Sequence, residues 1–390
     1  MIAVEEAVAR ITAALKPLES EYAGIGSAAG RVLATDTHAK ADQPLFAVSM
    51  MDGYAVRSAD SGVRRVIGSA PAGHPFAGTL GPGDALRLFT GSVVPDGADA
   101  VLAQEDAKRD GDQVDFTEIA TPGKFIRPRG LDFQAGSLLV SQGRRLTSRD
   151  LALLAAGDLA EVPVRRRPVI AFAATGDELS RPGQPRKPGG IVASSVYGLD
   201  AMIVQWGGQP KDLGILPDKP EAIAALAKEE CDLLVTLGGA SVGEHDLVQA
   251  ALSTQGFALD FWKIAMRPGK PLIFGHLGAT PFLGLPGNPV SGMVCALLFL
   301  RPAIGAMLGL SAQILLRRAR LAGSLPANDG RQDYLRATCE WQGGDLWARP
   351  FPAQDSSMLK FFAEADALIV RKPHAPSTEN GAVVEIVPLD

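Results

Sequence analysis

The spacing of apolar residues changes character several times along the chain. Residues 1–16, MIAVEEAVARITAALK, place apolar residues at helical intervals, which predicts an amphipathic helix. From about residue 44 to residue 122, short β-prone runs are separated by glycine and proline turns, the pattern of a small β domain. A second helical pattern follows, which Thr147 or Ser148 could cap and Gly157 would end.

Between Pro168 and about Ser311, runs of strand length alternate with runs of helical length. The run VIAFAAT predicts a strand, SSVYGLDAMIVQWGG a helix, and CDLLVTLGG a further strand. This alternation predicts βαβ units and a parallel sheet. After Leu315 it stops, and turn-spaced runs such as DYLRATCEW and AVVEIVPL predict a C-terminal β domain.

These patterns predict a multidomain α/β plus β protein, and 390 residues are too many for one ordinary core. A doubly wound α/β domain would occupy residues 168–312, and a β domain residues 313–390. Residues 1–43 and 126–167 would together form an α+β domain, into which a small β domain at 44–125 is inserted.

Composition excludes several classes of protein. A net charge of −5 argues against nucleic acid as a partner. The three cysteines lie far apart, at spacings that support neither a disulfide framework nor a zinc site. The N-terminus is acidic where a signal peptide needs basic residues, so we expect a cytoplasmic protein. Arg301 and Pro302 interrupt the apolar run Val290–Leu310, which predicts a buried helix and a second, turn-bounded segment, and no membrane span.

The segment 233–246, LLVTLGGASVGEHD, contains the main candidate site. Its apolar half predicts a central strand, and Gly238, Gly239 and Gly243 would let the following backbone turn with its N–H groups toward an anion. In a doubly wound sheet, ligands bind at the carboxyl ends of the strands. Glycine pairs usually form simple turns, so the prediction of a phosphate site depends on further clusters.

Two acidic clusters support that prediction. MMDGYAV, residues 50–56, begins the β segment with an acid and a glycine, although taken alone an Asp-Gly turn is the favoured explanation. ATGDEL, residues 174–179, directly follows the strand VIAFAAT and places Thr175, Asp177 and Glu178 at its carboxyl end. Capping of a helix by Asp177 is the structural alternative.

Carboxylates could also gather around a metal ion. Asp232 begins the predicted strand, and Glu244 and Asp246 follow its glycine loop. Together with Glu178 they suit Mg²⁺, which prefers a few carboxylate oxygens and phosphate. Ordinary surface charge is the alternative.

The fourth cluster is Phe261–Pro289. It contains three cations, Lys263, Arg267 and Lys270, and ends with Asn288 and Pro289, a strong signal for the start of a helix. The N–H groups of such a helix start favour an anion. The residues alone thus predict binding of a phosphorylated, anionic ligand with Mg²⁺, and leave the reaction open.

Taken in order, these and other motifs resemble the molybdopterin molybdenumtransferase family, which comprises the MoeA proteins of bacteria and the C-terminal domain of gephyrin. The motifs are MMDGYAV, FTGSVVPDGADAV, FIRPRGLD, RLTSRDLALLAAGDLAEVPV, TGDEL, GGASVGEHD, FWKIAMRPGKP and LPGNPVS. The resemblance covers nearly the whole chain. It implies an elongated N-terminal domain, a molybdopterin-binding α/β domain and a C-terminal β-barrel-like domain.

The resemblance also implies a reaction and partners. Molybdate would be inserted into adenylylated molybdopterin with the help of Mg²⁺, and AMP would be released. The protein would be a homodimer, with a cleft between the α/β domain of one subunit and the β domain of the other. A molybdopterin adenylyltransferase or proteins of molybdoenzyme maturation would be further partners.

The residues and the resemblance together predict the site. The catalytic set is Asp52, Thr90, Asp132, Glu178, Asp246, Lys263 and Arg267, and the metal ligands are Glu178, Asp232 and Asp246. The ligand-binding set is Thr175, Gly176, Asp177, Gly238, Gly239, Ser241, Gly243, Lys270, Pro286, Gly287, Asn288, Pro289, Ser291, Arg336 and Ser356.

The chain departs from the family pattern at several positions. Leu131 replaces an acid, Leu237 a small hydroxyl residue, Arg267 a common lysine, and Ala193 and Ser195 an Asp and an Asn in the segment IVASSV. Ser194 or Ser195 could still cap the following helix, while a ligand contact would be lost. Two alternatives therefore remain: a weakened or non-catalytic paralogue that carries molybdopterin, and a molybdopterin adenylyltransferase, which shares the α/β domain.

Overall fold

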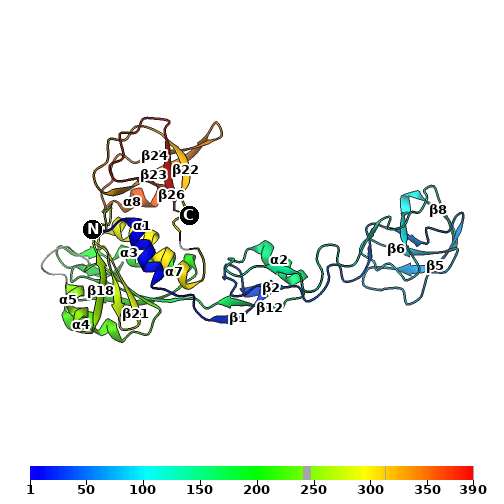
Figure 1. Ribbon diagram of the computed structural model, residues 1–390, viewed down its shortest axis with the longest axis horizontal. Coiled ribbons are helices and arrows are strands. Elements are labelled where there is room, and N and C mark those ends of the chain that lie inside the picture. The colour runs from blue at the N-terminus through cyan, green and yellow to red at the C-terminus, as the bar shows by residue number, and fades with distance from the viewer. Residues whose placement is uncertain (240–246, 312, 390) are drawn as a thin grey trace. The chain divides into compact units, whose positions relative to one another are not determined.

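The computed structural model describes residues 1–239, 247–311 and 313–389 (Figure 1). It divides into two compact units, Tyr22–Val164 and the combination of Met1–Glu21 with Arg165–Asp390. The first 21 residues thus join the α/β part, whereas the pattern predicted that they join residues 126–167. The reason is helix α1 (Val4–Ala13), which buries Val4, Ala7 and Ile11 and packs on helix α7 (Arg301–Met307).

The α/β part is built on a six-stranded sheet in the order β16-β13-β17-β21-β20-β18. The first four strands are parallel, and β20 and β18 run antiparallel to their neighbours. The predicted parallel sheet is therefore confirmed at its centre and extended by an antiparallel edge. The strands are β13 (Val169–Thr175), β16 (Gln209–Leu216), β17 (Leu233–Leu237), β18 (Phe257–Trp262), β20 (Ile273–Leu277) and β21 (Thr280–Leu285).

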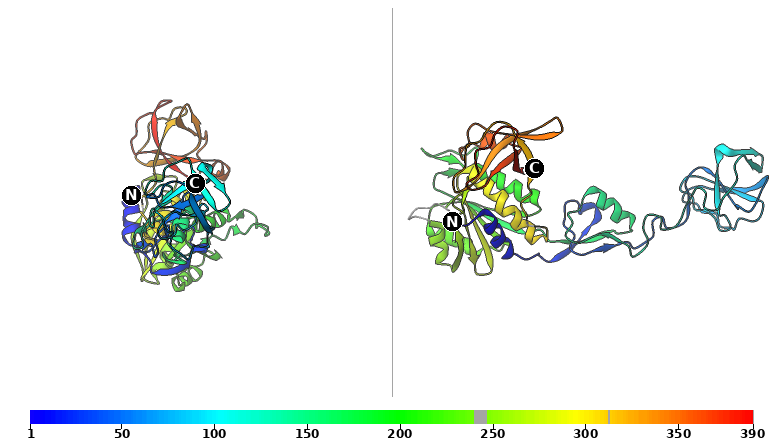
Figure 2. Two further views of the ribbon diagram at one scale, coloured as in Figure 1. Left: turned by 90° about the vertical axis from the view of Figure 1, so that its right-hand side faces the viewer. Right: turned by 45° about the horizontal axis from the view of Figure 1, so that its top comes forward.

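Helices cover both faces of this sheet, as a doubly wound fold requires (Figures 1 and 2). On one face, α4 (Pro220–Ala224) and α5 (Leu247–Ser253) bury Ile223, Val248 and Leu252 against β13, β17 and β21. On the other, α3 (Ser194–Trp206) packs against β13, β16, α6 (Pro289–Cys295) and α7.

The apolar run after Asn288 forms one continuous helix, so the prediction of a second, turn-bounded segment is wrong. Helices α6 and α7 are joined by a π-helical turn, Ala296–Leu300, and Pro302 lies in the first turn of α7. The wider turn accommodates the proline, which lacks an N–H group. Pro289–Met307 is long and apolar enough to cross a membrane, but 89% of its most apolar window is buried inside the protein, as in a core helix.

The C-terminal strands close into the predicted β-barrel-like domain, because β25 pairs with both β26 and β23. A two-residue strand from the α/β part, β19 (Met266–Arg267), adds to β23. The other elements are β22 (Arg317–Leu321), β23 (Gln332–Gln342), β24 (Asp345–Pro350), α8 (Leu359–Ala363), β25 (Ala367–Arg371) and β26 (Val383–Pro388).

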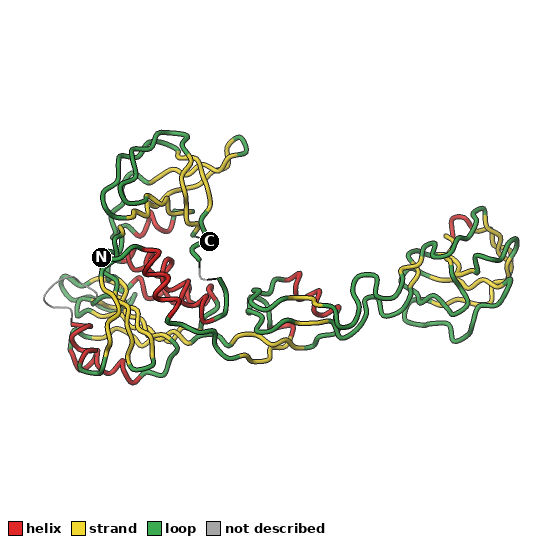
Figure 3. Tube along the Cα trace, in the orientation of Figure 1, coloured by secondary structure: helices red, strands yellow, loops and turns green. Residues whose placement is uncertain are grey.

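The unit Tyr22–Val164 is rich in strands (Figure 3). Its six-stranded sheet has the order β7-β4-β6-β5-β9-β8, formed by Gly53–Val56 (β4), Arg64–Ala70 (β5), Asp84–Leu88 (β6), Ala100–Ala103 (β7), Ala107–Asp110 (β8) and Gln113–Phe116 (β9). Short pairs join the segments on either side of this β domain, namely β2 (Thr37–His38) with β11 (Leu138–Val140) and β3 (Val48–Ser49) with β10 (Ile126–Arg127). The strands β1 (Ser20–Gly24) and β12 (Glu161–Arg165) lie at the ends of the unit.

Helix α2 (Ser148–Ala156) has the predicted cap. Thr147 accepts a hydrogen bond from the Asp150 N–H, and Asp150 accepts one from the Thr147 N–H, which together form a capping box.

Candidate functional site

A cavity of about 640 Å³ lies at the carboxyl ends of β13, β17 and β21. The sheet changes its direction of growth at β13, which has β16 on one side and β17 on the other. This is the topological switch point at which open α/β sheets bind ligands. Nine predicted residues line the cavity: Thr175, Gly176, Glu178, Gly238, Gly239, Pro286, Gly287, Asn288 and Pro289.

The two glycines after β17 bring the ends of the central strands close together. A Cβ atom on Gly238 would lie 2.9 Å from the carbonyl oxygen of Thr175, and one on Gly239 would lie 2.1 Å from Val248 Cγ2. Both glycines also have positive φ angles, 97° and 69°. The predicted need for glycine is therefore explained. The predicted Ser241, Gly243 and Asp246 lie outside the described residues.

Thr175 contributes a polar group that the protein does not use. The residue is 6% exposed and lines the cavity, and its Oγ1 has no hydrogen-bond partner among the described residues. Buried hydroxyl groups are nearly always hydrogen-bonded. Thr175 is therefore suited to a polar group of a ligand.

Among the residues that the structure describes, two acids line the cavity, Glu178 and Asp218. Asp177, which was predicted to bind the ligand, is not among the lining residues and instead connects two loops. Its N–H donates to Asp218 Oδ2 at 3.3 Å, and the Asp218 N–H donates to Asp177 Oδ1 at 3.4 Å. Asp177 thus holds Asp218 at the cavity.

Asp232 is far from this cavity, so its predicted role as a metal ligand beside Glu178 is wrong. It precedes β17, whereas the cavity lies beyond the other end of the strand, at Gly238. At the usual rise, six residues of strand span about 20 Å. Arg166 donates to both carboxylate oxygens of Asp232 at 2.8 Å, and the Val169 N–H donates at 2.7 Å.

The structure therefore predicts that Asp232→Asn lowers stability. Burial alone would raise the pKa of the Asp232 carboxyl, but the hydrogen bonds from Arg166 and Val169 lower it below its ordinary value. A lowered pKa stabilises the fold at neutral pH, and this stabilisation is lost as the pH falls through the folded-state pKa. We expect Asp232→Asn to lower the free energy of unfolding by about 1–3 kcal/mol at pH 7, with the difference shrinking below about pH 4.

Urea denaturation of both proteins between pH 3 and pH 7 measures this difference. Asp260→Asn is the matched control, because Asp260 pairs with Arg10 at an exposed site and should have a small effect. A pH-independent loss in Asp232→Asn would contradict the prediction.

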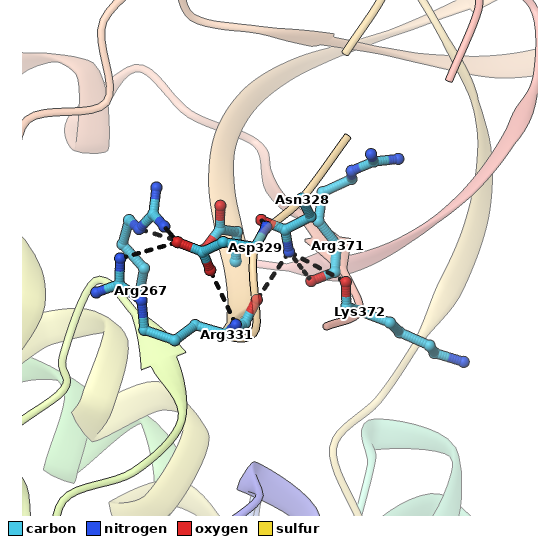
Figure 4. Close-up of polar contacts among 7 residues, drawn as sticks. Arg267, Asn328, Asp329, Arg331, Arg371 and Lys372 are labelled. Atoms are coloured by element: carbon cyan, nitrogen blue, oxygen red, sulfur yellow. Dashed lines mark hydrogen bonds and ion pairs between the residues drawn. The ribbon is translucent and has the colours of Figure 1, made fainter. Parts of the chain in front are cut away.

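The three predicted cations lie in the connection 263–272 between β18 and β20, in which Arg267 belongs to β19. Lys270 directly precedes Pro271, which lines the cavity. Arg267 forms an ion pair with Asp329 (Figure 4), and its Nε lies 3.5 Å from Asp333 Oδ1. Arg331 also contacts Asp329. Carboxylates of the C-terminal barrel thus neutralise Arg267, and within the described part of the chain Lys263 and Lys270 have no ion pair.

The start of α6 meets the C-terminal barrel. Asn288 and Pro289 begin the helix as predicted. Asn288 Nδ2 donates to Ser356 Oγ at 3.1 Å, and the Val290 N–H donates to the Ser356 carbonyl at 3.0 Å. Ser291, one residue further, is buried. The predicted Ser356 is therefore placed next to a residue that lines the cavity.

Arg336, also in the barrel, is 2% exposed. Its Nε donates to Gln354 at 3.2 Å and its Nη1 to the Met358 carbonyl at 3.1 Å, while Nη2 has no partner among the described residues. Burial lowers the pKa of this guanidinium. A buried cation with an unused N–H group favours an anionic acceptor.

Helix α3 also begins at the cavity, but the predicted cap is wrong. Ala193 is the N-cap residue and has no side chain that can accept a hydrogen bond. Ser194 and Ser195 lie within the first turn of the helix. The first N–H groups of α3 therefore lack a side-chain cap at a wall of the cavity.

The remaining predicted residues lie in the unit Tyr22–Val164. The Thr90 N–H donates to Asp52 Oδ1 at 2.9 Å and the Thr90 hydroxyl at 3.0 Å, and these bonds lower the pKa of Asp52 below its ordinary value. Asp132 is exposed, and its N–H donates to the Gln43 carbonyl. Asp52 and Thr90 are thus brought together as predicted.

Comparison with known proteins identifies the family. Residues 2–157 match the MoeA N-terminal region (domain I and II), residues 171–306 a probable molybdopterin binding domain, and residues 318–389 the MoeA C-terminal region (domain IV). The molybdopterin molybdenumtransferase of Haemophilus influenzae is 33% identical over 96% of this chain and 95% of that protein. The chain belongs to the molybdopterin molybdenumtransferase family. The predicted resemblance is thereby confirmed.

Two further relatives of the family agree. The molybdopterin molybdenumtransferase of a Nostoc species is 35% identical over 81% of this chain and 76% of that protein. The crystal structure of the molybdopterin biosynthesis MoeA protein from Pyrococcus horikosii superposes with a TM-score of 0.88, at 30% identity, over 100% of this chain and 99% of that chain.

Sequence reasoning missed several lining residues of this family member, notably Asp218, Ile223 and Pro271. Asp218 had a usable signal, because it follows the strand β16 as Glu178 follows β13. Ile223 and Pro271 had none, since nothing in an apolar residue or a loop proline indicates that it faces a cavity.

Proposed function

We propose that this protein inserts molybdate into adenylylated molybdopterin in a Mg²⁺-dependent reaction that releases AMP. The observation that carries the proposal is the cavity at the switch point, which combines tightly approaching glycines, an unpartnered Thr175 hydroxyl and two carboxylates. The relatives named molybdopterin molybdenumtransferase support it.

The charge of the cavity supports a metal ion in this reaction. Among the described lining residues there is no lysine or arginine, while Glu178 and Asp218 are acids. A pyrophosphate-containing ligand would therefore meet carboxylates without a neutralising cation. The two acids and the ligand's phosphate oxygens form the oxygen-rich donor set that Mg²⁺ prefers. When bound there, Mg²⁺ would neutralise charge on the phosphates.

The protein's own residues would orient the ligand. The Gly239 N–H group and the uncapped start of α3 would bind phosphate oxygens, whereas the Gly238 N–H already donates to the Leu285 carbonyl at 3.0 Å. The Thr175 hydroxyl would bind a further polar atom of the ligand. The Glu178 carboxylate packs closely against Gly176, where a Cβ atom would lie 2.4 Å from Glu178 Oε2.

Molybdate would bind near the start of α6. The unused Nη2 of Arg336 and the hydroxyl groups of Ser356 and Ser291 are donors of the kind that an oxyanion needs. Pro289 begins the helix but has no N–H group to donate. Lys270 would add positive charge from the adjoining loop.

The proposal includes a homodimer in which Asp52 and Thr90 of one copy complete the cleft of the other. In support, Met50 and Phe89, which neighbour these two residues in the chain, are large apolar side chains that are 44% and 37% exposed. A single-protomer mass in light scattering at micromolar concentration would contradict the dimer.

The test is AMP release from adenylylated molybdopterin, measured with and without molybdate and Mg²⁺. Release that depends on both, with formation of active cofactor, supports the transferase. Tight binding without release contradicts it and favours a carrier.

The carrier remains as a second candidate because Ala193 leaves α3 without a side-chain cap at the cavity. If the lost Asp and Asn weaken catalysis, Ala193→Asp together with Ser195→Asn should raise the rate of AMP release severalfold. The new N-cap should also raise the free energy of unfolding by about 1 kcal/mol. Ala193→Gly is the control, and an unchanged rate in the double variant would mean that these departures are tolerated.

A further inference from the structure

Lys263 has a strained backbone. Its φ angle is 76°, in the left-handed region that residues other than glycine seldom adopt. Backbone hydrogen bonds hold it there: its N–H donates to the Leu272 carbonyl at 3.3 Å, and its carbonyl accepts from the Ile2 N–H at 3.2 Å. Such strain persists where the surroundings enforce it, and it gathers at functional sites.

The side chain of Lys263 lies on the face of an aromatic ring. Its Nζ atom is 3.9 Å from the centre of the Trp262 ring. Trp262 ends β18, pairs with Ile273 and packs against the core beneath α4 and α5, so the ring itself is held in place.

The ring face is the part of Trp262 that makes a polar interaction. The indole Nε1 atom is buried and has no hydrogen-bond partner among the described residues. A buried N–H group without a partner is unfavourable, so a hydrogen bond does not explain a tryptophan here. An indole is the strongest of the aromatic faces in binding a cation.

Lys263 thereby keeps its positive charge available. Arg267, on the same loop, is neutralised by Asp329 and Asp333. An indole face attracts an ammonium group but leaves its net positive charge, whereas a carboxylate would cancel that charge. Lys263 is hydrogen-bonded to Leu272, the neighbour of the cavity-lining Pro271.

We infer that Trp262 is a positioning residue, which holds the Lys263 ammonium at the edge of the cavity for the anionic ligand. This inference rests on the proposed function, since it makes Lys263 a ligand contact. Loss of the ring would release the lysine side chain and weaken binding in the ground state and the transition state alike, so KM would rise while kcat stayed nearly constant.

Four variants test this by steady-state AMP release: Trp262→Leu, Trp262→Phe, Lys263→Met and the double variant Trp262→Leu with Lys263→Met. We expect Trp262→Leu to raise KM for adenylylated molybdopterin about 2- to 5-fold and Trp262→Phe to restore most of the loss. In the Lys263→Met background, the Trp262→Leu change should have no further effect. Trp341→Leu is the matched control, because Trp341 is 72% exposed.

An unchanged KM in Trp262→Leu, or losses that multiply in the double variant, would overturn the inference. Thermal denaturation of each variant separates this effect from unfolding, since a purely structural role would lower stability equally with or without Lys263.

A second measurement does not depend on the reaction. After ¹³C-dimethylation of lysines, the Lys263 methyl signal, assigned by its absence from Lys263→Met, should show an upfield ring-current shift that Trp262→Leu removes. A normal shift in the wild type overturns the placement of Lys263 on the ring. If the shift is present but no AMP is released, the proposed function fails and the placement stands.

Discussion

Glu178→Gln is expected to lower the rate of AMP release by about 100- to 1,000-fold while leaving the fold intact. The carboxylate lies in the cavity against the backbone of Gly176. Glutamine has the same shape but no negative charge, so the cavity would keep its form and lose one of the two acids that line it among the described residues. Steady-state AMP release at several Mg²⁺ concentrations measures the effect.

The matched control is Asp232→Asn, which also removes one carboxylate charge from the α/β domain, at the opposite end of the strands. Asp232→Asn should lower stability and spare turnover, whereas Glu178→Gln should do the reverse. Turnover like the wild type in Glu178→Gln would remove Glu178 from the proposed reaction. Equal losses of turnover in both variants would show that the rate of AMP release depends on the overall negative charge of the α/β domain and not on Glu178 in particular.

Gly53→Ala is expected to destabilise the unit Tyr22–Val164 by about 3 kcal/mol or more, the range of a severe packing defect. A Cβ atom at this position would lie 2.1 Å from the carbonyl oxygen of Leu102 in the neighbouring strand β7. Because the obstacle is backbone, no side-chain rotation can relieve it, and β4 and β7 would have to separate.

Urea unfolding followed by circular dichroism measures this loss. Gly62→Ala is a control at a glycine with open space around it but a positive φ angle of 72°, so it should cost about 1 kcal/mol. Since Asp52 precedes Gly53, turnover should fall as well. A stable Gly53→Ala protein would mean that the two strands can move apart at little cost.

Gly53 is a residue whose structural role could not be predicted from the sequence. An aspartate followed by a glycine is a common turn signal, and that interpretation was open for Asp52 and Gly53. The structure instead places Gly53 at the start of β4, between Leu88 of β6 and Ala103 of β7. Glycine is required there by a close strand contact, which depends on residues about fifty positions away in the chain.

Helices and strands were predicted correctly where their formation depends on residues that are neighbours in the chain. Thr147 caps α2, because a capping box needs only a residue type and its next three neighbours. Asn288 and Pro289 begin α6 as predicted, although the Asn288 side chain bonds to Ser356 and does not cap the helix. The strand VIAFAAT and the helix that begins at residue 194 follow from apolar spacing alone. The predicted cap of α3 was wrong because Ser194 and Ser195 lie one and two positions beyond the N-cap residue Ala193.

Strand order also explains which site residues could be predicted. Thr175 ends β13, Glu178 follows it, and the two glycines follow β17, so their common edge was implied by the alternation of strand and helix. Asp232 precedes its strand and could have been excluded by the same rule.

Other residues depend on contacts between parts that are distant in the chain. Arg267 is paired with Asp329, Asn288 with Ser356, and Asp177 with Asp218. The residues near Arg267 or Asn288 in the chain do not indicate which distant residue will contact it. That distant residue decides whether a charged side chain is neutralised or can bind a ligand.

The amino-acid pattern of this protein was therefore sufficient for its family, its sheet and the edge at which a ligand would bind, because each follows from residue types at short range. Only the tertiary structure determines which charged side chains near that edge of the sheet are neutralised by an ion pair. Lys263 lies on an indole while Arg267 is bound by carboxylates, although both are cations of the same loop. The reason is physical: the availability of a charge depends on its neighbours in space. The carboxylates beside Arg267 come from the C-terminal barrel, whereas the ring beside Lys263 belongs to the α/β domain itself.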